Sequence, residues 1–342
     1  MRLSWAAIRV AGLHVALVVL PVALASGCHV PGTGGPGADG QGATSGSGPI
    51  TVAVVPGIDN APLRVAVKDG LFQQHGLNVV INDYQSPDAV IQALTSGQAQ
   101  VAVGDYTIFF YQQATGRAAL RLIADGYDAA PDSVAILTLP GSGITTPQQL
   151  PGQPGGVATP PAQVIPYSAA VPYNMETLAA EEVLQNDGVS PSSVNWTQMQ
   201  ASDMIGALRS GQVKAILATE PYILEAEEQL GAVEVADASS GVTSGLPLSG
   251  YFSLASYARA NRPVVQAFQQ ALDQAQADCA QRGPVQAVLP QLTTMSTRDA
   301  AQVTLGTYPT SLNTGQVQRV ATLMYDSGMI RDPVNVGALA SG

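Results

Sequence analysis

Apolar and polar positions follow the same pattern twice in the middle of this chain. Residues 93–105 read ALTSGQAQVAVGD, and residues 207–220 read ALRSGQVKAILATE. Each copy predicts a helix that ends at Ser-Gly, where Gly97 or Gly211 takes the left-handed conformation that closes a helix. The short apolar run that follows predicts a buried strand of the kind found in parallel sheets covered on both faces.

The pattern also repeats upstream of these stretches. Residues 72–81 and 184–196 each show a helix end, a capping glycine and a strand in that order, with Gly76 and Gly188 as the caps. Ser-Gly-Gln alone is a common helix stop in a glutamine-rich protein, but the matching order of the flanking elements favours two α/β units of similar plan. Ligands of open α/β sheets sit at the carboxyl ends of the strands, so the turns after the repeated strands are candidate ligand loops.

The remaining periodicities extend this plan into two lobes. We expect the first lobe to cover residues 50–138 and 246–342, and the second lobe to cover residues 139–245. A chain that starts one lobe, builds a second and then returns makes two connections, which predicts a hinge. Strands are predicted at 50–55, 78–82, 120–123, 133–139, 233–236 and 251–255, and helices at 63–72, 86–97, 108–115, 175–185, 223–229, 263–281, 284–292, 297–305 and 315–327.

The N-terminus has the pattern of an export and anchoring signal. An apolar run at residues 10–25 follows two arginines, is too short for a membrane span and is typical of a signal peptide over residues 1–27. It ends at LASGC, which resembles a bacterial lipobox with Cys28 as the lipid-modified residue, although Ala25 stands where leucine is usual. Residues 28–49 are rich in Gly, Ser, Thr, Pro and Ala, which predicts a flexible, lipid-anchored tether.

The amino-acid composition argues against nucleic-acid binding, binding to anionic membranes and catalysis. Charged residues make up 11% of the chain, its net charge is −11 and it has only two lysines, which argues against a basic patch for nucleic acid or anionic membranes. Cys279 lies in a predicted helix and is interpreted as a small buried hydrophobe, so no disulfide is expected once Cys28 is acylated. Beyond the signal peptide and tether the sequence has a single histidine, His75, and no metal-ligand motif, nucleophile elbow or phosphate loop. We therefore expect no catalytic residues, no metal and no cofactor.

Three segments resemble a known family. Residues 68–80, 91–105 and 220–222 read KDGLFQQHGLNVV, IQALTSGQAQVAVGD and EPY. They are similar to the solute-binding proteins of ABC importers for nitrate, sulfonates, taurine and thiamine-pyrimidine precursors. The resemblance implies an α/β, bilobal periplasmic-binding-protein-like fold (type II), with two α/β lobes joined by a hinge. Part of this superfamily resembles pyrimidine synthases that use histidine and iron, a role against which the single histidine argues.

The same resemblance implies how such a protein works in the cell. We expect an extracytoplasmic protein whose two lobes close on a small-molecule solute, and we expect it to be a monomer that the lipid on Cys28 anchors to the bacterial membrane. Its partners are the ABC permease and ATPase subunits that receive the solute. A lipid-tethered extracytoplasmic sensor needs the same closing cleft and stays open as an alternative function.

Position within the two predicted units indicates which residues face the cleft. One wall is predicted to hold Asp59, Asn60, Asp105, Tyr106 and Thr107, and the other to hold Tyr173, Asn174, Glu220 and Tyr222. Each has a purely structural alternative. The asparagines and Asp105 are suited to cap helices, and the tyrosines to cover apolar surface.

Side-chain chemistry favours one class of solute. No arginine falls in the predicted loops, whereas carboxylates with tyrosines suit an amine or amino-heterocycle through charge-assisted hydrogen bonds and ring stacking. An aminopyrimidine thiamine precursor is therefore favoured. The alternative is an alkanesulfonate, taurine or nitrate held by helix N-termini and backbone amides. Arg117, Arg121 and Arg209 are interpreted as solvated helix ends, with a position in the cleft as the alternative.

Overall fold

Two five-stranded sheets organise the chain in the computed structural model. It describes residues 48–151, 162–163, 174–194, 197–199, 201–293 and 295–341. The predicted signal peptide, Cys28, almost all of the tether, and Tyr173 lie outside these residues. Within the described residues, no helix has both the length and the apolar character that crossing a membrane requires.

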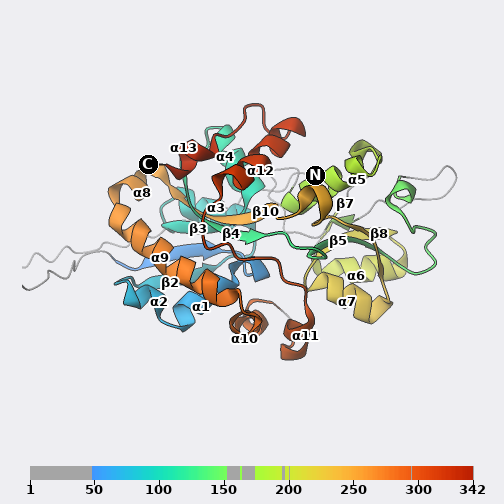
Figure 1. The fold of residues 1–342 in the computed structure, drawn as a ribbon, viewed down its shortest axis with the longest axis horizontal. Coiled ribbons are helices and arrows are strands. Elements are labelled where there is room, and N and C mark those ends of the chain that lie inside the picture. The colour runs from blue at the N-terminus through green and yellow to red at the C-terminus, as the bar shows by residue number, and fades with distance from the viewer. Residues whose placement is uncertain are drawn as a thin grey trace, which may run out of the picture. The chain divides into compact units, whose positions relative to one another are not determined.

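The first sheet has the strand order β2-β1-β3-β10-β4 (Figure 1). Its first three strands are parallel, and β10 runs antiparallel to both of its neighbours. The bounds are β1 Ile50–Val54, β2 Val79–Asp83, β3 Val101–Asp105, β4 Leu120–Asp128 and β10 Pro247–Leu254.

The second sheet repeats this plan in the order β7-β6-β8-β5-β9. Ala53 of β1 lies opposite Ala102 of β3, and Ala162 of β6 lies opposite Ile216 of β8. Ala102 and Ile216 occupy equivalent positions in the two copies of the sequence repeat. Each pairs with an earlier parallel strand of its own sheet, so the two copies share their strand register as well as their order of elements. The bounds are β5 Val134–Thr138, β6 Ala162–Gln163, β7 Thr197–Gln198, β8 Ala215–Thr219 and β9 Val233–Asp237.

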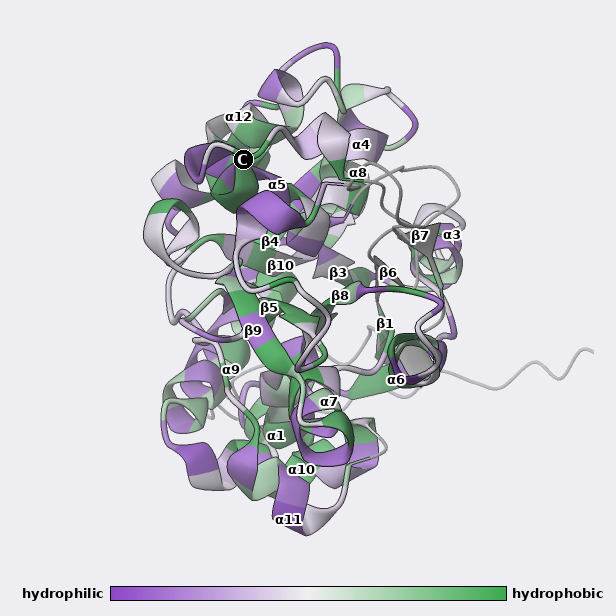
Figure 2. Ribbon diagram, turned by 90° about the vertical axis from the view of Figure 1, so that its right-hand side faces the viewer, coloured by the Kyte–Doolittle hydropathy of each residue, from purple (hydrophilic) through white to green (hydrophobic). Residues whose placement is uncertain are grey.

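The chain crosses between the two sheets twice, once at β5 and once at β10. Strand β10 returns to the first sheet, as predicted, where it pairs with β3 and β4. Strand β5 pairs with β8 and β9 in the second sheet, whereas we had expected residues 134–138 to close the first lobe. All five residues of β5 are buried and Figure 2 colours the strand hydrophobic, a character that suits either sheet, so only tertiary pairing assigns it.

Glycines end the helices of the repeat as the pattern predicts. Gly97 and Gly211 have φ of 77° and 74°, and Gly76 and Gly188 have φ of 73° and 77°. The helix predicted at 63–72 is instead divided into α1 and α2 by Gly70, whose φ is 71°. Helices with their bounds are α1 Ala61–Lys68, α2 Leu71–Gln74, α3 Pro87–Thr95, α4 Tyr106–Ala114, α5 Met175–Asn186, α6 Ala201–Ser210, α7 Tyr222–Leu230, α8 Ala255–Ala260, α9 Arg262–Cys279, α10 Arg282–Leu292, α11 Thr297–Gln302, α12 Thr314–Asp326 and α13 Val336–Ala340.

Helices cover both faces of the first sheet. Helices α1, α2 and α9 lie on one side, and α3, α4 and α12 lie on the other (Figure 1). The tail helices α8–α13 therefore complete the first lobe. Helix α5 packs against β5, β8 and β9, which places its N-terminus in the second lobe.

Candidate functional site

Asp105 joins the two lobes. It ends β3, and its Oδ1 accepts hydrogen bonds from Thr107 N and Thr107 Oγ1, each at 2.7 Å, so it caps α4. Its Oδ2 accepts a hydrogen bond at 2.9 Å from the backbone N–H of Met175, the first residue of α5. One carboxylate thus lies at the N-termini of two helices that belong to different lobes.

Three acidic side chains form a carboxylate cluster at this junction, namely Asp59, Asp105 and Glu176. Asp59 lies in the turn of 3-10 helix Ile58–Asn60 that follows β1, and Glu176 lies in the first turn of α5. The charge of Asp59 contributes to raising the pKa of Asp105, and the charges of Asp105 and Asp59 both raise the pKa of Glu176. Because Asp59 acts on Asp105, and both act on Glu176, the three carboxylates lie near one another although they are far apart in the sequence.

Burial is the largest cause of the pKa shifts in the carboxylate cluster. It raises the pKa of Asp59 to about 6, although the hydrogen bond that Asp59 accepts from Asn60 opposes the shift. Burial also raises the pKa of Asp105 to about 6, against the hydrogen bonds from Met175 and Thr107. The pKa of Glu176 lies well above its ordinary value.

No cation compensates these charges among the described residues. No lysine, arginine or histidine contributes to the pKa shift of any member of the carboxylate cluster. The sequence of residues 152–173, which precedes α5, also contains none of these residue types. Since buried carboxylates are costly without a positive partner, a cationic ligand would stabilise this junction.

Several buried polar atoms beside the carboxylate cluster lack hydrogen-bond partners in the described structure. They are Glu176 Oε2, Asn60 Oδ1 and the hydroxyl of Tyr251, whose pKa the charge of Asp59 helps to raise. Asn60 Nδ2 donates to Val55 O at 2.8 Å and to Asp59 Oδ1 at 3.1 Å, which orients the amide but leaves its oxygen unsatisfied. Because buried acceptors rarely remain unpaired, a ligand rich in donors fits this place.

Two tyrosines lie beside Asp59. The rings of Tyr127 and Tyr308 have centroids 5.1 Å apart and are tilted by 49°. The hydroxyl of Tyr308 donates to Ile58 O at 2.8 Å, and the hydroxyl of Tyr127 accepts from Gly306 N. The charge of Asp59 contributes to the raised pKa of both phenols, after burial. The carboxylate cluster therefore has an aromatic neighbour on its first-lobe side.

Three further predicted residues, Asn60, Thr107 and Asn174, lie next to members of this junction. Asn60 does not cap α1 with its side chain, because it binds the Val55 carbonyl instead. Thr107 is fully buried against Asp105. Asn174 caps α5, with its Oδ1 accepting from Thr177 N at 2.9 Å. Asp105 also takes its structural alternative, the cap of α4, so a capping role and a position at the junction coincide.

Tyr106 does not line the junction, contrary to our expectation. It is completely buried in the first lobe, where its hydroxyl donates to Asp125 Oδ1 at 2.7 Å and its ring packs against Phe110 and Phe252. The reason is Gly250 on β10, which has no side chain and lets the Tyr106 ring cross the strand. A Cβ on Gly250 would lie 2.7 Å from the ring.

Glu220 and Tyr222 lie apart from the carboxylate cluster. Glu220 accepts hydrogen bonds from Leu224 N at 3.1 Å and from Thr304 N at 2.8 Å, so it links β8 to the chain after α11. Tyr222, the first residue of α7, is half-buried and packs against the core of the second lobe. Glu220 still borders the junction through Tyr127, because its charge also raises the pKa of that phenol.

The sequence analysis missed Glu176, Ser249, Tyr251, Tyr127 and Tyr308. For Glu176 a signal existed, since it lies two residues after the predicted cap Asn174 in the first helical turn. Ser249 lies opposite Asp105 in the register of β10 and β3, two residues before the strand we had predicted. The tyrosines had no local signal, because only the paired strands and the returning tail bring them to Asp59.

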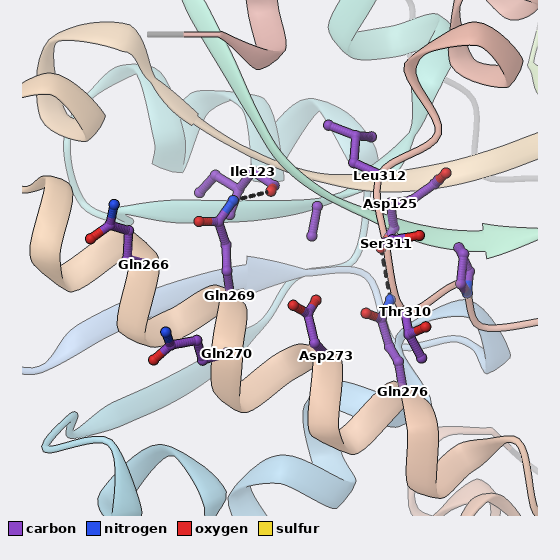
Figure 3. A pocket seen from close by; sticks show the side chains of 12 residues that line it. Ile123, Asp125, Gln266, Gln269, Gln270, Asp273, Gln276, Thr310, Ser311 and Leu312 are labelled. Atoms are coloured by element: carbon purple, nitrogen blue, oxygen red, sulfur yellow. Dashed lines mark hydrogen bonds between the residues drawn. The ribbon is translucent and has the colours of Figure 1, made fainter.

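A separate cavity of about 530 Å³ lies between α9, β4 and residues 309–312 (Figure 3). Gln269 and Gln276 of α9 line it and donate to the edge carbonyls Ile123 O, at 2.6 Å, and Asp125 O, at 2.7 Å. These two glutamines therefore supply hydrogen-bond donors to backbone carbonyl groups of β4, the edge strand of the first sheet. A solute there would contact one lobe only and could not favour closure of two lobes.

Comparisons with known proteins agree with the architecture. The profile described as NMT1/THI5 like matches residues 58–287. No curated protein sequence matches the chain. The alkanesulfonate-binding protein SsuA from Xanthomonas axonopodis pv. citri has a TM-score of 0.65 and 19% identity, covering 85% of this chain and 97% of that one.

Two further solved structures have the same fold. The periplasmic aliphatic sulphonate binding protein SsuA from Escherichia coli has a TM-score of 0.68 and 17% identity, covering 86% of this chain and 98% of that one. The periplasmic nitrate-binding protein NrtA from Synechocystis PCC 6803 has a TM-score of 0.67 and 14% identity, covering 85% of this chain and 84% of that one. At these identities the likeness establishes the bilobal periplasmic-binding-protein fold.

Proposed function

This chain belongs to the NMT1/THI5-like family, and from that premise we propose that it is the extracytoplasmic solute-binding component of an ABC importer. Its two lobes would capture a small molecule at the carboxylate cluster and present it to a permease driven by an ATPase subunit. We propose a binding role and not a catalytic one.

The observation that carries the proposal is the uncompensated charge of the carboxylate cluster. Asp59, Asp105 and Glu176 meet at the lobe junction with no basic side chain among the groups that shift their pKa values. A cation would lower the cost of holding these charges away from water and would supply donors to the unpartnered Glu176 Oε2. We therefore propose a protonated amine or amino-heterocycle as the solute.

An aminopyrimidine thiamine precursor fits these requirements. A protonated ring nitrogen and an adjacent amino group form a two-donor edge that matches the two oxygens of a carboxylate. Its flat ring also matches the neighbouring pair Tyr127 and Tyr308. Sulfonate and nitrate offer only acceptors, which would face three carboxylates.

We propose further that the protein works at the outer face of a bacterial membrane. Residues 1–27 would direct export, Cys28 would carry a lipid, and residues 28–49 would tether a monomeric two-lobed unit. A tethered binding protein stays near its permease, which removes the need for free diffusion. Metabolic labelling with a radioactive fatty acid tests the anchor: label should enter the protein and be lost in Cys28→Ser, and equal label in both would refute it.

Thermal-shift screening of the full-length protein tests the proposed solute. The panel contains the hydroxymethyl-aminopyrimidine thiamine precursor, simple amines, taurine, longer alkanesulfonates and nitrate. A ligand that binds only the folded state raises the melting temperature by mass action. A shift with the aminopyrimidine or an amine supports the proposal, whereas a shift with sulfonates or nitrate alone refutes the cationic solute and leaves the transport role.

A further inference from the structure

We propose that Asp105 is a specificity-determining residue that excludes anionic solutes by occupying the N-terminus of α5 with its own carboxylate. This inference rests on the proposed function, since it concerns the same junction between the lobes. It assigns Asp105 a role different from that of Glu176: Asp105 fills a place that an anion would take, and Glu176 presents a free oxygen to a cation.

The N-terminus of a helix is suited to bind anions, because its backbone N–H groups point outward and its dipole is positive there. Helix α5 has 12 residues, and its first N–H group, that of Met175, is already hydrogen-bonded to Asp105 Oδ2 at 2.9 Å. The N–H of Thr177, two residues further on, donates to Asn174 Oδ1 at 2.9 Å. A sulfonate or nitrate that approached α5 would have to displace the side chain of Asp105.

The carboxylates around Asp105 oppose any second anion. Glu176 follows Met175 directly, and the charges of Asp105 and Asp59 both raise its pKa, while the charge of Asp59 also raises the pKa of Asp105. Glu176 Oε2 has no hydrogen-bond partner in the described structure, whereas both oxygens of Asp105 are engaged. The local field is therefore unfavourable for an acceptor-only ligand even where a backbone donor is within reach.

A charged residue is not required at this position to build the fold. Serine and asparagine cap helices about as well as aspartate, so α4 does not need the negative charge. The repeat gives a second indication, because Thr219 occupies the equivalent place in the second lobe. Thr219 lies opposite Val134 on the antiparallel neighbour of β8, just as Asp105 lies opposite Ser249 on the antiparallel neighbour of β3. The charge of Asp105 is thus free to serve selectivity.

The test replaces Asp105 and asks for a gain of anion binding, which a purely structural role would not produce. Asp105→Ser and Asp105→Asn both keep a capping side chain and remove the charge, and thermal unfolding confirms that each variant is folded. Asp69→Asn is the matched control, because it removes one negative charge from an exposed site of the first lobe. Calorimetric titration of the full-length proteins with sodium sulfate and sodium methanesulfonate, at constant ionic strength, measures the affinity.

We expect at least one Asp105 variant to bind sulfate or methanesulfonate at least tenfold more tightly than the wild-type protein, while Asp69→Asn stays at the wild-type level. The inference is overturned if neither variant gains affinity, if Asp69→Asn gains as much, or if the wild-type protein already binds these anions as tightly as the variants. Titration of the wild-type protein with the aminopyrimidine separates the two proposals. Its failure refutes the cationic solute, whereas a gain of sulfate binding in the variants still supports the role of Asp105.

Discussion

Glu176→Gln should weaken binding of a cationic solute while stabilising the ligand-free protein. Glutamine keeps the shape of the side chain and removes the charge of a half-buried carboxyl group. Burial is the main cause of the raised pKa of this group, and the charge of Asp105 is the next. One charge-assisted hydrogen bond contributes about 2 kcal/mol, which corresponds to roughly a 30-fold increase in the dissociation constant. Removing this buried charge should add about 1 kcal/mol to the free energy of unfolding, which corresponds to about 2 °C in melting temperature.

This prediction is specific because stability and solute affinity should change in opposite directions. A residue that only supports the fold would lower stability and affinity together, whereas Glu176→Gln should raise the first and lower the second. Isothermal titration with the aminopyrimidine and calorimetric melting, both at about pH 8 so that the carboxyl group is more fully ionised, measure the two quantities. Glu182→Gln on the same helix is the control, because its raised pKa arises from burial and Asp326 and not from the junction. An affinity of Glu176→Gln equal to that of the control, or a lower melting temperature, would refute the reasoning.

Three further results are expected. The pKa of Asp59 and of Asp105 is about 6 in the folded protein, against an ordinary value of 3.8. Between these pH values the folded state binds more protons than the unfolded state, so the melting temperature of the ligand-free protein should rise as the pH falls from about 7 to about 5. Asp59→Asn should flatten this slope, and an unchanged slope would contradict the assignment. Tyr106→Phe removes the donor to buried Asp125 and should cost about 2 kcal/mol in urea unfolding with solute affinity unchanged, whereas weaker binding would place Tyr106 at the site after all. Gly250→Ala should cost about 2 kcal/mol because its Cβ meets the Tyr106 ring, and Gly283→Ala, with open space around it, should cost nothing.

Local signals in the sequence predicted the order and kind of the elements well. The capping glycines of the repeat adopt the left-handed conformation, and the tail helices α9 to α12 begin and end close to their predicted bounds, whereas α8 and α13 were not predicted. These features depend on a few neighbouring residues, such as a proline in a first turn or a glycine at a helix end. The family resemblance and the bilobal fold are likewise confirmed, because the motifs that carry them lie within single helix-strand units.

Side-chain directions at strand ends were predicted less well. Asp105 and Tyr106 are adjacent and were both placed on the cleft wall, yet one reaches α5 and the other turns into the core. The difference depends on Gly250, which lies on a strand that is far away in the sequence and runs beside β3. Tyr173 and Cys28 lie outside the described residues, so their roles stay predictions.

The sequence by itself determined that two α/β units exist, where their strands end, and that acidic residues are abundant at those ends while basic ones are absent. Only the tertiary structure decided that β5 belongs to the second sheet and that Asp59, Asp105 and Glu176 share one junction. The physical reason is the range of the interactions concerned. Helix caps and apolar periodicity act within a few residues, whereas the hydrogen bond from Met175 to Asp105 joins positions 70 residues apart and depends on how two lobes pack.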